Sequence, residues 1–134
     1  MEELVVSNTE RLYLVMNMAV KRFRMTKSEK AQKAVTDRQK MESVDSLDVQ
    51  TVFDHWIETH KSGTKRKPML DAKRRMILAI AIYDYGVDGC KDAIDGCANS
   101  HFHMGKNKQG KVYNSLELIF RDAGTIERFM GYNE

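Results

Sequence analysis

The fold of this chain is decided by residues 70–86, which read LDAKRRMILAIAIYDYG. Apolar residues recur there at three- and four-residue spacing, from Met76 to Ala81, so the stretch predicts the most apolar helix in the sequence. Asp71 suits the positive end of the helix dipole and marks the beginning of this helix. Gly86 ends it, because only glycine adopts the left-handed backbone conformation cheaply.

Further helices are predicted on both sides of this stretch, at residues 9–23, 26–41, 49–59, 88–98, 116–121 and 126–130. Their N-caps are expected at side chains that accept hydrogen bonds from free backbone N–H groups: Asn8 or Thr9, Thr26 with Glu29 reaching back as a capping box, Ser46 or Asp48, Asp88, Asn114 or Ser115, and Thr125. Gly105, Asn107 and Gly110 interrupt any helix between residues 99 and 114. That segment is therefore expected to be an ordered loop or a short hairpin.

The predicted fold is all-α, a compact bundle of about five to seven helices with one long ordered loop near residues 99–114. Residues 1–45 are expected to form an N-terminal helical segment that acts as an adaptor or in dimerisation, and residues 46–134 the main module. The 26–41 helix has only weak apolar positions, so we expect it to be exposed or to pack against something other than its own core. Trp56 is expected in the core.

The composition indicates a soluble helical protein. Hydrophobic residues make up 42% of the chain and there is one proline, so a core can form and helices are favoured. No apolar run approaches the ~20 residues that cross a bilayer, and the acidic start Met1-Glu2-Glu3 is unlike a secretory signal. Two cysteines do not make a disulfide framework. We therefore expect a reduced, cytoplasmic protein.

Positive charge is concentrated in two segments. Residues 61–75 contain seven Lys or Arg against one acidic residue, and residues 21–40 contain eight against two, so each segment carries a net charge of +6. Because the whole chain carries only +3, the remainder is strongly acidic. Such segregation creates local positive fields that attract phosphate backbones. Charge alone leaves two interpretations open: a site for a polyanion, or a solvated helix face with a flexible basic loop.

No catalytic constellation is convincing, and the chain is expected not to be an enzyme. Cys97 could take His101 or His103 as a base, but nothing marks an orienting third group or an oxyanion hole. The acidic residues near the end of the chain have the spacing of solvated helix faces rather than of a two-metal site. No Gly-x-x-x-x-Gly-Lys-[Ser/Thr] motif is present, which argues against ATP hydrolysis by a P-loop.

Cys90, Cys97, His101 and His103 have the side-chain types of a zinc site. Their spacing argues against one, because the two cysteines lie seven residues apart on one predicted helix. That separation is about 10.5 Å along the helix axis, whereas a Zn–S bond is ~2.3 Å long. Neither a metal nor a cofactor is therefore expected, and both cysteines are interpreted as small buried apolar side chains.

The best candidate site combines basic residues with aromatic ones, in the loop and helix start after residue 60 and in the loop after residue 100. Its expected nucleic-acid-binding members are Lys65, Arg66, Lys67, Lys73, Arg74, Arg75, Phe102, His103, Lys106 and Lys108. The cations and the backbone N–H groups at the helix start suit phosphate oxygens, and bases could stack on Phe102 or His103. The favoured alternative for Phe102 and Met104 is that they plug the loop onto the core.

Residues 52–134 resemble a known family in a series of short motifs: FDHW at 53–56, LDAKRR at 70–75, YG at 85–86, AIDGC at 93–97, FHMGKN at 102–107 and IERF at 126–129. In order and spacing they resemble the C-terminal module of phage replication initiator and replisome-organiser proteins, and more loosely the end of DnaD-like primosome proteins. The resemblance implies a role in DNA replication, binding to single-stranded DNA, and a contact with the replicative helicase or its loader. It also implies a location in the cytoplasm of a bacterial host cell.

The chain departs from that family at its front, where family members carry a winged-helix origin-binding domain and only about 50 residues stand here. Two functions stay open. The first is a non-enzymatic replication accessory protein that binds DNA, the helicase or its loader. The alternative is a small phage or mobile-element protein that inhibits a host replication or defence complex by protein–protein binding. The apolar stripe from Leu12 to Ala19 would in either case allow a homodimer.

Overall fold

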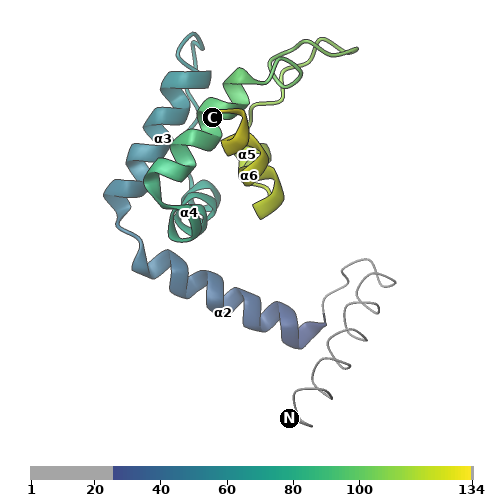
Figure 1. Cartoon of the computed structure of the whole chain (residues 1–134). Helices are drawn as coiled ribbons and strands as arrows, with labels where there is room; N and C mark the ends of the chain where they lie inside the picture. The colour runs from purple at the N-terminus through teal and green to yellow at the C-terminus, as the bar shows by residue number, and fades with distance from the viewer. Residues whose placement is uncertain (1–25, 134) are drawn as a thin grey trace. The chain divides into compact units, whose positions relative to one another are not determined.

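A computed structural model describes residues 26–133, which contain five α-helices and no strand (Figure 1). In chain order the helices are α2 (Lys27–Ser43), α3 (Ser46–His60), α4 (Ala72–Asn99), α5 (Leu116–Ile119) and α6 (Ala123–Tyr132). The all-α prediction is confirmed. The helix predicted at residues 9–23 lies outside the described residues. Within residues 26–133, no helix combines the length and the apolar content that a bilayer crossing requires.

The chain divides into two units, residues 1–36 and residues 37–134, and the boundary falls within α2. α2 begins with the predicted capping box: the Glu29 N–H donates to Thr26 Oγ1 at 3.1 Å, and the Thr26 N–H donates to the Glu29 carboxylate at 3.4 Å. No residue of α2 is buried, as its weak apolar positions predicted. The last turn of α2 belongs to the second unit, where Lys40 Nζ lies 2.9 Å from Asp84 Oδ1.

α4 is the central helix of the second unit, because α3, α5 and α6 all pack against it. Each of these helices contributes to the fully buried side chains of the core, the largest of which include Trp56, Leu78, Ile94, Leu116 and Phe129. Burying a side chain of this size contributes about 1.5–3 kcal/mol, so the contacts around α4 are the main source of stability in this unit. The core position predicted for Trp56 is confirmed.

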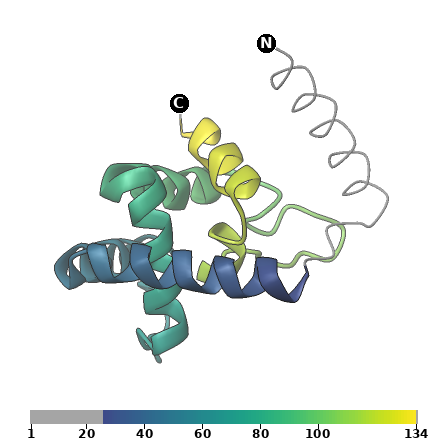
Figure 2. The same ribbon diagram turned by 90° about the horizontal axis from the view of Figure 1, so that it is seen from below.

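α4 breaks at Gly86, where φ is 75° and ψ is 170°. Glycine suits this position because a side chain would strain a backbone with positive φ. The helix resumes after Gly86, so residues 72–85 and 87–99 run in different directions (Figures 1 and 2). The predicted break is confirmed, but the predicted cap Asp88 is wrong, because the helix has already resumed at Val87.

α4 and α6 approach each other closely at Gly96. A Cβ atom placed there would stand 1.6 Å from the carbonyl oxygen of Phe129, which is far inside van der Waals contact. The backbones of the two helices can therefore cross at this point only because residue 96 has no side chain. This crossing also positions Phe129, whose ring is buried in the core.

Asp71, predicted at the beginning of α4, is the N-cap of that helix, and Ser115, one of the two predicted caps of α5, is the N-cap of α5. For α3 the prediction of Ser46 or Asp48 is wrong, because Asp45 is the N-cap. Its carboxylate accepts a hydrogen bond from the backbone two residues later at 2.9 Å. Ser46 and Asp48 already lie within the first turn, where their own backbone is helical.

The predicted cap of α6 is also wrong. Asp122, not Thr125, is the N-cap, and its Oδ1 accepts a hydrogen bond from the Thr125 N–H at 2.8 Å. This hydrogen bond lowers the pKa of the Asp122 carboxyl, since it favours the charged form. Thr125 is buried inside the helix, so α6 begins earlier than residue 126. It also continues past Gly131, the predicted end, to Tyr132.

Residues 100–114 form the predicted ordered loop, here called the hairpin. Met104 and Val112 pair across it as an isolated antiparallel bridge. Asn107 holds its tip, because Asn107 Nδ2 donates to the carbonyls of Phe102 and Lys111 at 2.8 and 2.7 Å, and Oδ1 accepts from the Lys111 N–H at 3.1 Å. The hairpin reaches away from α4 and α6 in both views (Figures 1 and 2).

Candidate nucleic-acid interface

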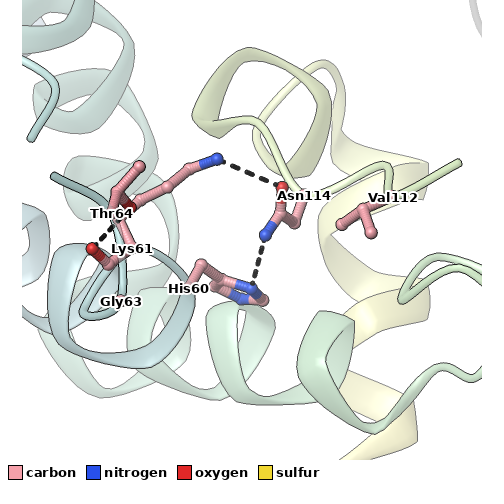
Figure 3. A pocket seen from close by; sticks show the side chains of 6 residues that line it. All are labelled: His60, Lys61, Gly63, Thr64, Val112 and Asn114. Carbon is pink, nitrogen blue, oxygen red and sulfur yellow. Dashed lines mark hydrogen bonds between the residues drawn. The ribbon is translucent and has the colours of Figure 1, made fainter. Parts of the chain in front are cut away.

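Two parts of the candidate site meet at a depression beside the end of α3 (Figure 3). Residues 61–70, here called the basic loop, form one wall, and the end of the hairpin forms the other. The depression has a volume of about 450 Å³, and its lining residues are His60, Lys61, Gly63, Thr64, Val112 and Asn114. The basic loop and the hairpin, which are far apart in the sequence, therefore border one surface.

A hydrogen-bond network around Asn114 joins the two walls (Figure 3). Its Oδ1 accepts from Lys61 Nζ at 3.4 Å, and its Nδ2 donates to His60 Nδ1 at 3.2 Å. The Asn114 carbonyl accepts from the indole N–H of Trp56 at 2.9 Å. Because Asn114 is buried, breaking these bonds would leave polar groups without partners at a cost of about 1–3 kcal/mol each. The network fixes the end of the hairpin against α3.

His60 is neutral in this network. Its Nε2 lies 2.9 Å from the carbonyl oxygen of Ile94, which only accepts, so Nε2 carries the proton and Nδ1 accepts from Asn114. Burial lowers the pKa of His60, and the ammonium of Lys61 lowers it further. A second proton on Nδ1 would remove the acceptor that Asn114 needs.

Five of the six cations predicted between residues 65 and 75 are exposed. Lys65, Arg66 and Lys67 lie in the basic loop, and Lys73 and Arg75 lie in the first turn of α4. Among residues 26–133, none of the five makes an ion pair. A phosphate group can therefore approach them without breaking an internal contact.

Arg74 differs from its exposed neighbours. Its Nε lies 3.1 Å from a carboxylate oxygen of Glu117, and one of its terminal nitrogens donates to the carbonyl of Met69 at 2.8 Å. The guanidinium also lies 5.9 Å from the ring centre of Trp56. Arg74 thus ties the basic loop to α5, a role that its position in the sequence gave no signal for.

Phe102 lies on the surface of the hairpin. Its side chain is 55% exposed and that of Met104 is 37% exposed, so the favoured interpretation, in which both plug the loop onto the core, is wrong. Phe102 stacks on Tyr113 with ring centres 6.0 Å apart and an angle of 11° between the planes. This parallel pair supports Phe102 while leaving more than half of it open to solvent.

His103 faces inward instead. Its ring meets the buried ring of Phe129 edge-on, with centres 4.8 Å apart, and its Nδ1 lies 2.6 Å from Ser100 Oγ. Burial lowers the pKa of His103, and the positive charge of Arg128 lowers it further. His103 therefore anchors the base of the hairpin, and of the two predicted stacking residues Phe102 is the one with an open ring.

Three exposed lysines also lie in the hairpin. Lys106 and Lys108, both predicted, are exposed near its tip. Sequence reasoning missed Lys111, which is also exposed, and whose Nζ lies 5.6 Å from the ring centre of Tyr113. It also left Lys61 out of the site, although Lys61 lines the depression. The missed signal for Lys111 was Gly110, where the chain turns back so that Val112 pairs with Met104.

Cys90 and Cys97 are both buried and free. Burial raises the pKa of Cys90 to about 12 and that of Cys97 to about 11, so both are protonated thiols at neutral pH. The Cys97 thiol donates to the carbonyl of Tyr113 at 3.6 Å. Over residues 26–133, no three His, Cys, Asp or Glu side chains are placed together to hold a metal ion.

Comparison of the chain with protein-family models, curated proteins and solved structures finds no match.

Proposed function

We propose that residues 37–134 bind the phosphate backbone of nucleic acid through the surface where the basic loop and the hairpin border one depression. The observation that carries this proposal is that both bordering segments present exposed cations: Lys65, Arg66 and Lys67 in one, and Lys106, Lys108 and Lys111 in the other. Two basic segments on either side of a depression can contact successive phosphates of one strand.

Single-stranded nucleic acid is the form that this surface fits better. The exposed ring of Phe102, supported from behind by Tyr113, offers a flat apolar face on which an unpaired base can stack. Stacking of this kind contributes about 1–3 kcal/mol per base and tolerates any sequence. In a duplex the bases are already stacked on each other, so Phe102 would add little to its binding.

The cellular role that we propose is DNA replication. It rests on the resemblance of residues 52–134 to phage replication initiators, whose corresponding module is associated with single-stranded DNA and with helicase delivery. On this proposal the protein is a non-enzymatic accessory that binds DNA and contacts the replicative helicase or its loader in a bacterial host cell. Nothing in the proposal requires a cofactor.

The test is fluorescence anisotropy with labelled single-stranded and double-stranded oligonucleotides of the same sequence, at about 50 mM and about 200 mM salt. We expect tighter binding to the single strand and a loss of affinity at the higher salt, since released counterions drive the association. Equal binding to both forms would remove Phe102 from the site. No binding at concentrations near 100 μM, roughly the weak end of non-specific DNA affinity, would contradict the proposal and leave the protein-directed inhibitor.

A further inference from the structure

A narrow apolar cleft lies between the first half of α4 and the junction of α5 and α6. Its volume is about 130 Å³, close to that of a cavity of ~150 Å³ that accepts a benzene ring. The apolar side chains that line it include Ile77, Ile80, Phe120 and Ile126. The cleft can hold one branched or aromatic side chain, and it shares no lining residue with the depression beside α3.

One lining residue, Ile80, belongs to an apolar row of α4 that is largely exposed. Met76, Ile80 and Tyr83 lie four and three residues apart, so they share one face of the helix. Met76 and Tyr83 are exposed and Ile80 is half-buried, whereas Leu78 and Ile82 of the same helix are buried in the core. A helix that is apolar on its solvent face as well as its core face indicates an interaction surface.

Three charged residues line this cleft: Asp84, Asp122 and Arg121. Tyr85 also lines the cleft. Burial raises the pKa of Tyr85 most, and the negative charges of Glu127, Asp84 and Asp122 raise it further. Asp84 is paired with a lysine and Asp122 with an arginine. Among residues 26–133 Glu127 makes no ion pair, so the rim keeps an excess of negative charge.

We propose that this cleft binds a polypeptide partner, a short helical segment that inserts one apolar side chain and carries Lys or Arg beside it. The apolar lining accepts a side chain such as Leu or Phe, and the exposed row from Met76 to Tyr83 extends the contact along the segment. The carboxylate of Glu127 meets the cation. The negative rim repels phosphate, so the cleft is a protein site, separate from the proposed nucleic-acid interface and independent of it.

The probe is a labelled synthetic peptide of about 14 residues, roughly four helical turns, with Leu along one face and Lys elsewhere. Its anisotropy is measured with the full chain and with an Ala123→Phe variant. Ala123 is exposed and lines the cleft, so a phenyl ring there fills the cleft without disturbing the core. We expect the variant to bind the peptide at least about tenfold more weakly than the parent, as expected for loss of an anchoring pocket.

Three controls separate this site from general attraction of a basic peptide. Glu127→Gln should weaken binding by about two- to fourfold, the size of an exposed ion pair, and a peptide with Glu in place of Lys should not bind. Lys108→Ala, in the hairpin, should leave peptide binding unchanged. Circular dichroism shows that each variant is folded. Equal binding by the parent and Ala123→Phe, or no binding by the parent, would overturn the proposal.

Discussion

At the scale of single residues, His60 links the pH of the solution to stability. Its pKa is lowered in the folded protein by burial, so below the ordinary histidine pKa of 6.5 the unfolded chain binds the proton more readily. The stability that neutral His60 contributes is therefore present above that pH and is lost as the pH falls toward the folded-state pKa. We expect the free energy of unfolding in urea to decrease between about pH 7.5 and about pH 5.5, on either side of that value.

The His60→Gln variant separates this effect from other titrations. We expect it to be less stable than the parent at the higher pH, because the bonds to Ile94 and Asn114 are altered, but to lose less stability on acidification. Part of the decrease remains, since burial also lowers the pKa of His103. The exposed His101→Gln serves as the matched control and should keep the full decrease. An equal decrease in His60→Gln and the parent would show that His60 is not responsible.

Phe102 carries the second prediction at this scale. Phe102→Ala removes the exposed ring that stacks on Tyr113, and we expect affinity for a single-stranded oligonucleotide to fall about tenfold, within the range for one stacked base. Affinity for a duplex should stay the same. Tyr83→Ala, which removes a similarly exposed aromatic ring from α4, is the control. It should change neither the affinity for the single strand nor the affinity for the duplex. A parallel loss for single strand and duplex would indicate that Phe102 acts by holding the hairpin.

At the scale of helices, the crossing of α4 and α6 depends on Gly96. Gly96→Ala places a Cβ atom 1.6 Å from the Phe129 carbonyl oxygen, and only a backbone shift can relieve the overlap. We expect a loss of about 3 kcal/mol or more in the free energy of unfolding measured with urea. Gly131→Ala is the matched control in α6, because nothing lies within 4 Å of the added Cβ, and it should stabilise the protein by about 0.5–1 kcal/mol. Similar effects from both substitutions would contradict the close crossing.

Capping signals and apolar spacing together located the helices of residues 26–133, and Gly86 marked the break in α4 because the need for positive φ is a local property. The caps of α3 and α6 were missed for a physical reason. Several side chains near each helix start can accept a hydrogen bond, and packing decides which one stands at the end. Thr125 is buried against the core, so α6 begins earlier, at Ala123, and Asp122 is its N-cap.

At the scale of the whole molecule, the distribution of charge predicts how binding responds to salt. Replacing Lys65, Arg66 and Lys67 together by Ala should weaken DNA binding and reduce its logarithmic salt dependence by up to about three, since each phosphate contact contributes roughly 0.9 in a duplex. The matched control removes three exposed lysines from α2, Lys27, Lys30 and Lys33, and should have a smaller effect. If the triple variant in the basic loop keeps the parent's affinity at low salt and the parent's salt dependence, the basic loop is not part of the interface.

The helices, the ordered hairpin and the basic character of residues 61–75 can be predicted from the chain alone, because spacing, capping chemistry and charge are properties of neighbouring residues. Which of these residues share a surface depends instead on the tertiary fold. It brings Lys61 to Asn114, 53 residues away, and pairs Arg74 with Glu117, 43 residues away. It also exposes Phe102 and turns His103 inward. These outcomes follow from the packing of α3 and α6 against α4, and contacts between such distant residues leave no local pattern in the chain.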